Sequence, residues 1–153
     1  MKARNRWVGL LVGLLCAAST LAESKSIPVE DRNAFEKQFI ECAMEKFRNG
    51  CLLPLFLDHA SPKMKNPDIT VAQIDAVLQA MAGKSGVYGV HIISKTMKTD
   101  LYDDRAYIIE MGDGRLMCFR LIFENTLDKW YVFSYQFSDD KEALRKILGI
   151  PIL

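Results

Sequence analysis

The amino-acid sequence predicts an α+β protein, in which N-terminal helices pack on an antiparallel sheet of about four strands and a short helix ends the domain. Two segments with helical periodicity come first, and four segments rich in β-branched and aromatic residues follow. The chain has 153 residues, the size of one domain. Half of these residues are hydrophobic, which excludes a disordered protein.

Residues 1–22 have the organisation of a cleavable signal peptide. Three basic residues precede an uncharged apolar run over residues 7–18, and a small-x-small pattern predicts cleavage after Ala22. The run is shorter than the about 20 residues of a membrane-spanning helix. An uncleaved N-terminal anchor and a lipid attached to Cys16 are the alternatives. We therefore expect a periplasmic or secreted protein, with no membrane span after cleavage.

Removal of the signal makes the chain weakly acidic. Three of the 20 basic residues lie in residues 1–22, whereas all 19 acidic residues lie after them. A mature chain with a net charge of about −2 argues against a nucleic-acid partner, because nucleic-acid binding proteins carry basic surfaces.

The mature chain reads as one domain, without repeats, low-complexity stretches or an interdomain linker. Residues 23–30 are predicted to be a polar leader, residues 31–149 a single α+β domain, and residues 150–153 an apolar tail.

The first helix is predicted over residues 31–48, because apolar side chains recur there every four positions. Asp31 is its expected N-cap, and Asn49-Gly50 its stop. Residues 52–57 predict one or two helical turns. Thr70 then caps a helix over residues 71–82, which Gly83 ends.

The sheet is predicted from four strands and a final helix from its capping pattern. Asp113-Gly114 is a strong hairpin signal, and Asp139 with Glu142 predicts the start of the C-terminal helix. The strands are expected over residues 87–97, 105–111, 115–124 and 129–137. The acidic turn between the first two, with Asp100, Asp103 and Asp104, is expected to be a solvated hairpin loop.

Alternation along the last two strands predicts which face of the sheet is buried. One face carries only large apolar side chains, which we expect to point at the helices: Met117, Phe119, Leu121, Phe123, Tyr131, Phe133, Tyr135 and Phe137. The opposite face is mixed and includes the candidate partner-surface residues Arg120, Trp130, Val132 and Ser134. A partner or dimer interface and a face half covered by the tail are equally compatible with this pattern.

Three cysteines follow the signal. Cys42 and Cys51 flank the turn at Gly50, which can bring them within bridging distance, so a disulfide and two free thiols both remain open. Cys118 lies in an apolar strand and is expected to be a small buried hydrophobe. No CxxC pattern indicates a zinc ribbon or a thioredoxin-type site.

No motif predicts catalysis, a cofactor or a metal site. His59 and His91 are the two histidines. Neither belongs to a cluster of carboxylates at the spacing of metal ligands. The chain has no G-x-S-x-G motif around Ser134 or any other serine. Aromatic residues are the candidates for lining a ligand pocket, with core packing as the alternative: Tyr88, Tyr107, Phe119, Tyr131 and Tyr135.

Several stretches resemble small exported members of the nuclear transport factor 2-like superfamily. They are residues 60–65 before the Thr70-capped helix, residues 85–89 at the start of the sheet, and Asp128-Lys129-Trp130 in the last strand. The resemblance covers residues 30–148 and implies a curved antiparallel sheet that wraps around helices and can leave a pocket. Some members of that superfamily are isomerases, dehydratases or cyclases, and others bind or dimerise. No catalytic motif carries over to this chain.

The sequence therefore predicts an exported, non-catalytic binding or accessory module. It would bind an envelope protein, a second copy of itself or a small apolar ligand, through the sheet face or an aromatic-lined pocket. The alternative is a pocket enzyme of isomerase or dehydratase type, which needs buried ionisable groups around one deep cavity.

Overall fold

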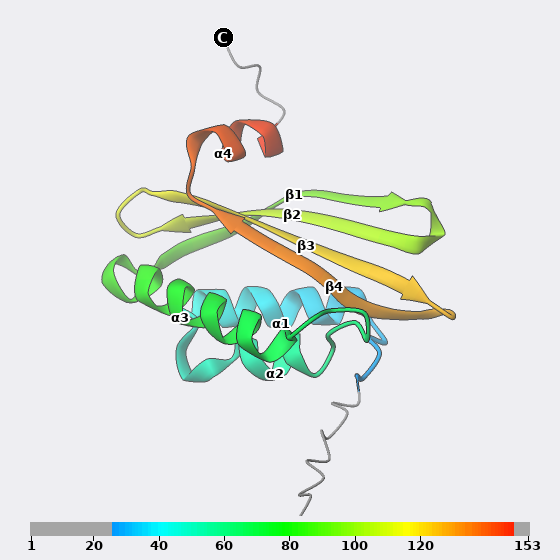
Figure 1. Cartoon of the computed structure of the whole chain (residues 1–153). Coiled ribbons are helices and arrows are strands. Elements are labelled where there is room, and N and C mark those ends of the chain that lie inside the picture. The colour runs from blue at the N-terminus through cyan, green and yellow to red at the C-terminus, as the bar shows by residue number, and fades with distance from the viewer. Residues whose placement is uncertain (1–25, 149–153) are drawn as a thin grey trace, which may run out of the picture.

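The computed structural model describes residues 26–148 and confirms the predicted α+β class. Three helices precede a four-stranded antiparallel sheet, and a short helix ends the domain. In Figure 1, α1 to α3 lie on one side of the sheet and α4 lies on the other. The elements are α1 (Arg32–Met44), α2 (Leu52–Leu57), α3 (Pro67–Ser85), β1 (Val87–Lys98), β2 (Tyr102–Met111), β3 (Leu116–Thr126), β4 (Lys129–Ser138) and α4 (Lys141–Leu148).

Helix α1 begins where the sequence predicts and ends earlier. The Asp31 side chain accepts hydrogen bonds from the backbone N–H groups of Asn33 and Ala34 at 2.8 and 3.2 Å, as an N-cap does. The helix stops at Met44 because the chain becomes left-handed at Lys46 and Phe47, with φ of 63° and 53°. This turn, rather than continued helix, brings Phe47 into the core, where it is fully buried.

Helix α3 is longer at both ends than residues 71–82. It begins at Pro67, whose fixed φ suits the first helical turn, so Thr70 lies inside the helix instead of capping it. The Thr70 hydroxyl donates to the Asn66 carbonyl at 3.1 Å. The helix continues through Gly83 and stops at Gly86, where φ is +79°.

The strands run in the order β1-β2-β3-β4, each antiparallel to its neighbour. Strand β2 begins at Tyr102, earlier than predicted, so Asp103 and Asp104 are not loop residues. They are 4% and 8% exposed, and both pair with arginines. The expectation of a solvated acidic loop is therefore wrong for these two residues, because burial here is balanced by opposite charge.

A bulge in β4 reverses the predicted faces of half of that strand. Ile122 of β3 pairs with Ser134, and the next residue, Phe123, pairs with Val132, so Phe133 is an extra residue in β4. Val132 is consequently fully buried, whereas Phe133 is 37% exposed. Tyr135 and Phe137 point at the helices as predicted, but Trp130 and Val132 take the positions expected for Tyr131 and Phe133.

The two edges of the sheet differ. Two neighbouring segments cover the edge of β4: Val29 N donates to Trp130 O at 2.7 Å, and Ala60 bridges Val132. On the other edge, β1 is the outermost strand of the described region, and its register with β2 shifts between Val87 and Gly89 and between Ile92 and Ser94.

Aromatic side chains fill the space between the helices and the sheet. Phe39 of α1 lies at the centre, with its ring centroid 4.6 Å from that of Phe119 and 5.3 Å from that of Tyr107. Phe56 of α2 contacts the Tyr135 ring at 5.1 Å. Within residues 26–148, no helix is long and apolar enough to span a membrane.

Candidate functional site

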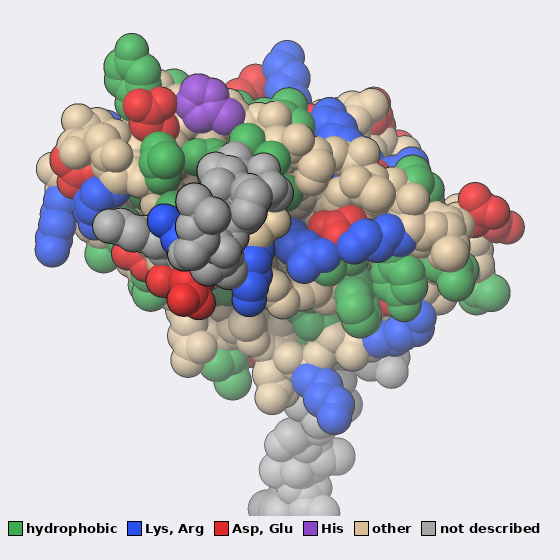
Figure 2. All heavy atoms as spheres, turned by 90° about the horizontal axis from the view of Figure 1, so that it is seen from above, with side chains coloured by type: hydrophobic (Ala, Val, Ile, Leu, Met, Phe, Trp, Pro, Cys, Tyr) green, Lys and Arg blue, Asp and Glu red, His purple; other side chains and the backbone are tan. Residues whose placement is uncertain are grey.

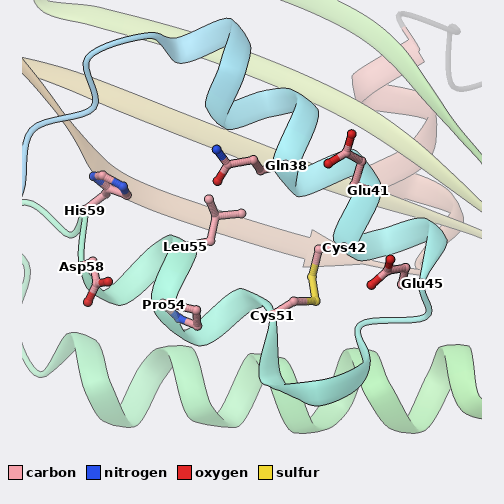
Figure 3. A pocket seen from close by; sticks show the side chains of 9 residues that line it. All are labelled: Gln38, Glu41, Cys42, Glu45, Cys51, Pro54, Leu55, Asp58 and His59. Atoms are coloured by element: carbon pink, nitrogen blue, oxygen red, sulfur yellow. A yellow bond between two sulfur atoms is a disulfide. The ribbon is translucent and has the colours of Figure 1, made fainter.

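A groove runs between α1 and α2 on the side of the helices away from the sheet (Figure 3). Its volume is about 380 Å³. A second hollow of about 290 Å³ adjoins it between the start of α1 and residues 27–31. Gln38 and His59 line both hollows, so the two form one extended groove. We refer to this surface as the α1–α2 groove.

The α1–α2 groove has an apolar lining and acidic side chains. Its apolar lining residues are Ile27, Pro28, Val29, Ala34, Phe35, Pro54 and Leu55, together with Cys42 and Cys51. Its carboxylates are Glu30, Asp31, Glu41, Glu45 and Asp58. Among the residues that line the two hollows there is no Lys or Arg.

Helical spacing places one row of these residues on α1. Gln38, Glu41, Cys42 and Glu45 are separated by three, four and seven positions, which puts them on one face of the helix. Figure 3 shows Cys42 pointing from α1 towards the α2 segment, where it is bonded to Cys51.

The predicted disulfide is confirmed. Cys42, near the end of α1, is bonded to Cys51, just before α2, with their Cα atoms 5.8 Å apart. The alternative of two free thiols is therefore wrong. Cys118 is the free cysteine of the described region; it is buried, and burial raises the pKa of its thiol. The disulfide holds the two walls of the groove together.

His59 is held in one orientation beside the groove. Its Nδ1 lies 2.8 Å from the carbonyl oxygen of Ile27, which can only accept, so Nδ1 carries a proton. Its ring packs edge-on against Phe35, at a centroid distance of 5.7 Å. In the neutral ring, Nε2 is then the acceptor. The histidine can therefore receive a hydrogen bond from a donor in the groove.

A separate cluster of charges lies on the opposite side of α1, against the sheet. Glu36 accepts hydrogen bonds from Tyr107 at 2.8 Å and Arg105 at 2.9 Å, and it pairs with Lys95 at 2.5 Å. Asp103 pairs with Arg105 at 2.9 Å and Arg32 at 2.8 Å. We refer to these six residues as the buried ionic network.

The residues of the buried ionic network pair with one another. Burial acts to raise the pKa of Glu36, but hydrogen bonds from Lys95 and Tyr107 and the charge of Arg105 outweigh it and hold that pKa below its usual value. Burial and the neighbouring Glu36 raise the pKa of Tyr107. None of the six lines the α1–α2 groove or the interior void. This arrangement stabilises the fold and offers no open position to a substrate.

The five predicted ligand-binding residues do not form one pocket. Tyr107 and Phe119 are buried in the core, whereas Tyr88 is 74% exposed on β1 and Tyr131 is half-buried. Phe119 and Tyr135 share an interior void of about 10 Å³, which has room for about one water molecule. The Tyr135 hydroxyl has no hydrogen-bond partner there, and burial raises its pKa to about 12.

The four predicted partner-surface residues lie on two faces. Trp130 packs against the core, with the Arg32 guanidinium 3.9 Å above its ring, and Val132 is fully buried. Arg120 and Ser134 lie on the face away from the helices, where Arg120 pairs with Asp104 at 2.5 Å. Figure 2 shows basic and hydrophobic side chains interspersed on that face.

The two histidines lie in different surroundings. His59 borders the groove, whereas His91 of β1 lies 3.1 Å from Glu110 of β2. In the part of the chain that the structure describes, no three His, Cys, Asp or Glu side chains are arranged to hold a metal ion.

No protein-family model matches this sequence, and no curated protein or solved structure matches it either.

Reasoning from the sequence missed the α1–α2 groove because separate segments build it. One signal could have indicated it: polar residues surround Cys42 on α1. A disulfide-bonded cysteine on a polar helix face indicates that the segment carrying its partner packs beside that face.

Proposed function

We propose that this protein is an exported, non-catalytic binding module that holds a segment of a protein partner in the α1–α2 groove. The observation that carries this proposal is the groove itself: a concave surface lined by both apolar and polar side chains, which the side chains of the described region leave open. The interior void offers less, because it has room for about one water molecule.

Export is part of the proposal. A disulfide in the domain and the absence of a membrane-spanning helix from residues 26–148 fit an exported protein. The signal over residues 1–22 and a periplasmic location are proposed from the sequence, since that segment lies outside the described residues, as does the predicted tail over residues 150–153.

We also propose a distant relationship to the nuclear transport factor 2-like superfamily. Its support is the arrangement of helices on one face of an antiparallel sheet and the sequence stretches that resemble that superfamily. The relationship suggests a fold in which binding members are common, which agrees with a binding role.

Peptide selection tests this function on the protein as a bacterial host exports it. A peptide library displayed on phage is selected against the oxidised protein, and the affinities of selected peptides are measured by fluorescence anisotropy. Gln38→Trp fills the groove from an exposed position that lines both hollows. Asn33→Trp is the matched control, an exposed and uncharged position on the same helix and outside the lining.

We expect Gln38→Trp to weaken binding by about tenfold or more and Asn33→Trp to leave it unchanged. A selection that yields no peptide, or peptides that are indifferent to Gln38→Trp, contradicts the proposed function.

A second candidate function is binding of a small apolar ligand inside the domain. The buried Tyr135 hydroxyl at the interior void favours it, because it has no hydrogen-bond partner among the described residues. The void has room for about one water molecule, so the core would have to open to admit the ligand. Native mass spectrometry of the exported protein would detect a retained ligand, and Tyr135→Phe should release it. A pocket enzyme of isomerase or dehydratase type would further need Glu36 or Asp103 to line this void, and neither does.

A further inference from the structure

We propose that the segment held in the α1–α2 groove is cationic, with Lys or Arg side chains beside apolar ones. This inference rests on the proposed function, since it names the chemistry of the partner at the same groove.

The charge of the lining is one-sided. Five carboxylates come from three segments: Glu30 and Asp31 before α1, Glu41 on α1 with Glu45 at its C-cap, and Asp58 after α2. All five are exposed to solvent. Because no Lys or Arg lines the groove, a cationic occupant would meet negative charge on both walls.

These carboxylates contribute little to ion pairing within the fold. Asp31 caps α1, and Glu41 lies 3.9 Å from Lys37. Glu30, Glu45 and Asp58 form no salt bridge within residues 26–148. Like charges on facing walls repel, and a bound cation relieves that repulsion. The groove is therefore complementary to positive charge.

The apolar lining and the histidine select a peptide over a bare ion. From Ala34 to Glu45 the groove follows eleven residue steps of α1, roughly 16 Å at 1.5 Å per residue. That length matches about five residues of extended chain. Ile27 and Pro54, which are exposed, offer apolar contact along it, and Nε2 of His59 in the neutral ring can accept a hydrogen bond from an ammonium or guanidinium group.

Three labelled peptides test this inference by fluorescence anisotropy. They are heptapeptides in which Leu alternates with Lys, with Gln or with Glu, so that only the charge differs. We expect the Lys peptide to bind about tenfold or more tightly than the Gln peptide, and the Glu peptide not to bind. We also expect the affinity of the Lys peptide to fall as salt is added, because the carboxylates are exposed.

Variants locate the effect. Glu45→Gln combined with Asp58→Asn should weaken the Lys peptide by about tenfold and leave the Gln peptide unchanged. The matched control is Glu142→Gln combined with Asp128→Asn, which also removes two exposed carboxylates, both outside the groove. A loss of equal size in the control overturns the inference, since it would report only the net charge of the protein.

The outcomes separate this inference from the proposed function. If the Lys and Gln peptides bind equally and both bind more weakly to Gln38→Trp, the partner is not cationic and the binding role stands. If neither the Lys peptide nor the Gln peptide binds more weakly to Gln38→Trp than to the wild-type protein, the groove is not the binding site, and both proposals fail.

Discussion

The two sides of α1 use carboxylates in opposite ways. On the sheet side, Glu36 is 4% exposed and meets three donors, Lys95, Arg105 and Tyr107. On the groove side, Glu45 is exposed and forms no salt bridge with the described residues. One helix and its C-cap thus carry a carboxylate that the fold requires and another that it does not.

The difference follows from desolvation. A carboxylate that loses its water must gain charged partners or take up a proton, because an unpaired buried charge costs several kcal/mol. An exposed carboxylate has no such need, so removing it costs the fold little free energy. Both the buried ionic network and the α1–α2 groove contain carboxylates. The two regions differ in whether those carboxylates have charged partners.

The largest expected effect comes from removing Arg105, which joins Glu36 and Asp103. Arg105→Met leaves two buried carboxylates with fewer partners, and we expect a loss of about 3–5 kcal/mol in the free energy of unfolding. Urea unfolding of the oxidised protein measures it. A loss under about 1 kcal/mol would mean that the network is replaceable and would remove the contrast between the two sides of α1.

Acid should weaken the fold through the paired carboxylates. The hydrogen bond from Arg120, acting against burial, together with Lys98, lowers the pKa of Asp104 to about 2. Its folded pKa is below the unfolded value, so its stabilisation is complete above about pH 4 and is lost as the pH falls towards 2. We expect a loss of at most about 2 kcal/mol from this residue. Urea midpoints between pH 5 and pH 2 should fall less steeply in Asp104→Asn; an unchanged slope contradicts the assignment.

Asp75 of α3 sharpens the comparison, because it is buried without a cation. It is 6% exposed, Gln79 donates to its Oδ2 at 2.6 Å, and its Oδ1 has no partner among the described residues. Burial raises its pKa, so ionisation destabilises the fold as the pH rises above about 4. Asp75→Asn should therefore stabilise the protein by about 1 kcal/mol at pH 7.

Thermal unfolding at two pH values checks this prediction. The gain of Asp75→Asn should shrink below about pH 4, where Asp75 itself is protonated in both states. A variant that is destabilised at pH 7 would show that the carboxylate has a charged partner after all.

The smallest expected effect is in the groove. Glu45→Gln with Asp58→Asn should change the free energy of unfolding by no more than about 0.5 kcal/mol, since both side chains are exposed and outside the salt bridges of the described region. Urea unfolding beside the wild-type protein measures this. A loss as large as that of Arg105→Met would assign the groove carboxylates to the fold and not to a partner.

Much of the fold could be predicted from the sequence because periodicity and turn residues are local. The stripe of Phe35, Phe39 and Ala43 and the hairpin at Asp113-Gly114 needed no knowledge of distant residues. The bulge at Phe133 could not be predicted, because one extra residue leaves the alternation of each half of β4 intact and reverses only their relation.

The candidate site was harder to predict, because residues far apart in the sequence build it. The burial of Asp103 depends on Arg32, which is 71 positions away, and the groove depends on the return of residues 51–59 along α1. The disulfide was within reach because the turn at Gly50 makes the proximity of Cys42 and Cys51 a local property.

The unequal edges of the sheet have a consequence for self-association. An exposed, regular edge strand is a template for strand addition and aggregation. Segments around Val29 and Ala60 already occupy the β4 edge, and two register shifts divide the β1 edge into short runs, the last of which carries Lys95 and Lys98. The folded protein should therefore remain dispersed at high concentration, and aggregation should begin only when the segment around Ala60 detaches from β4.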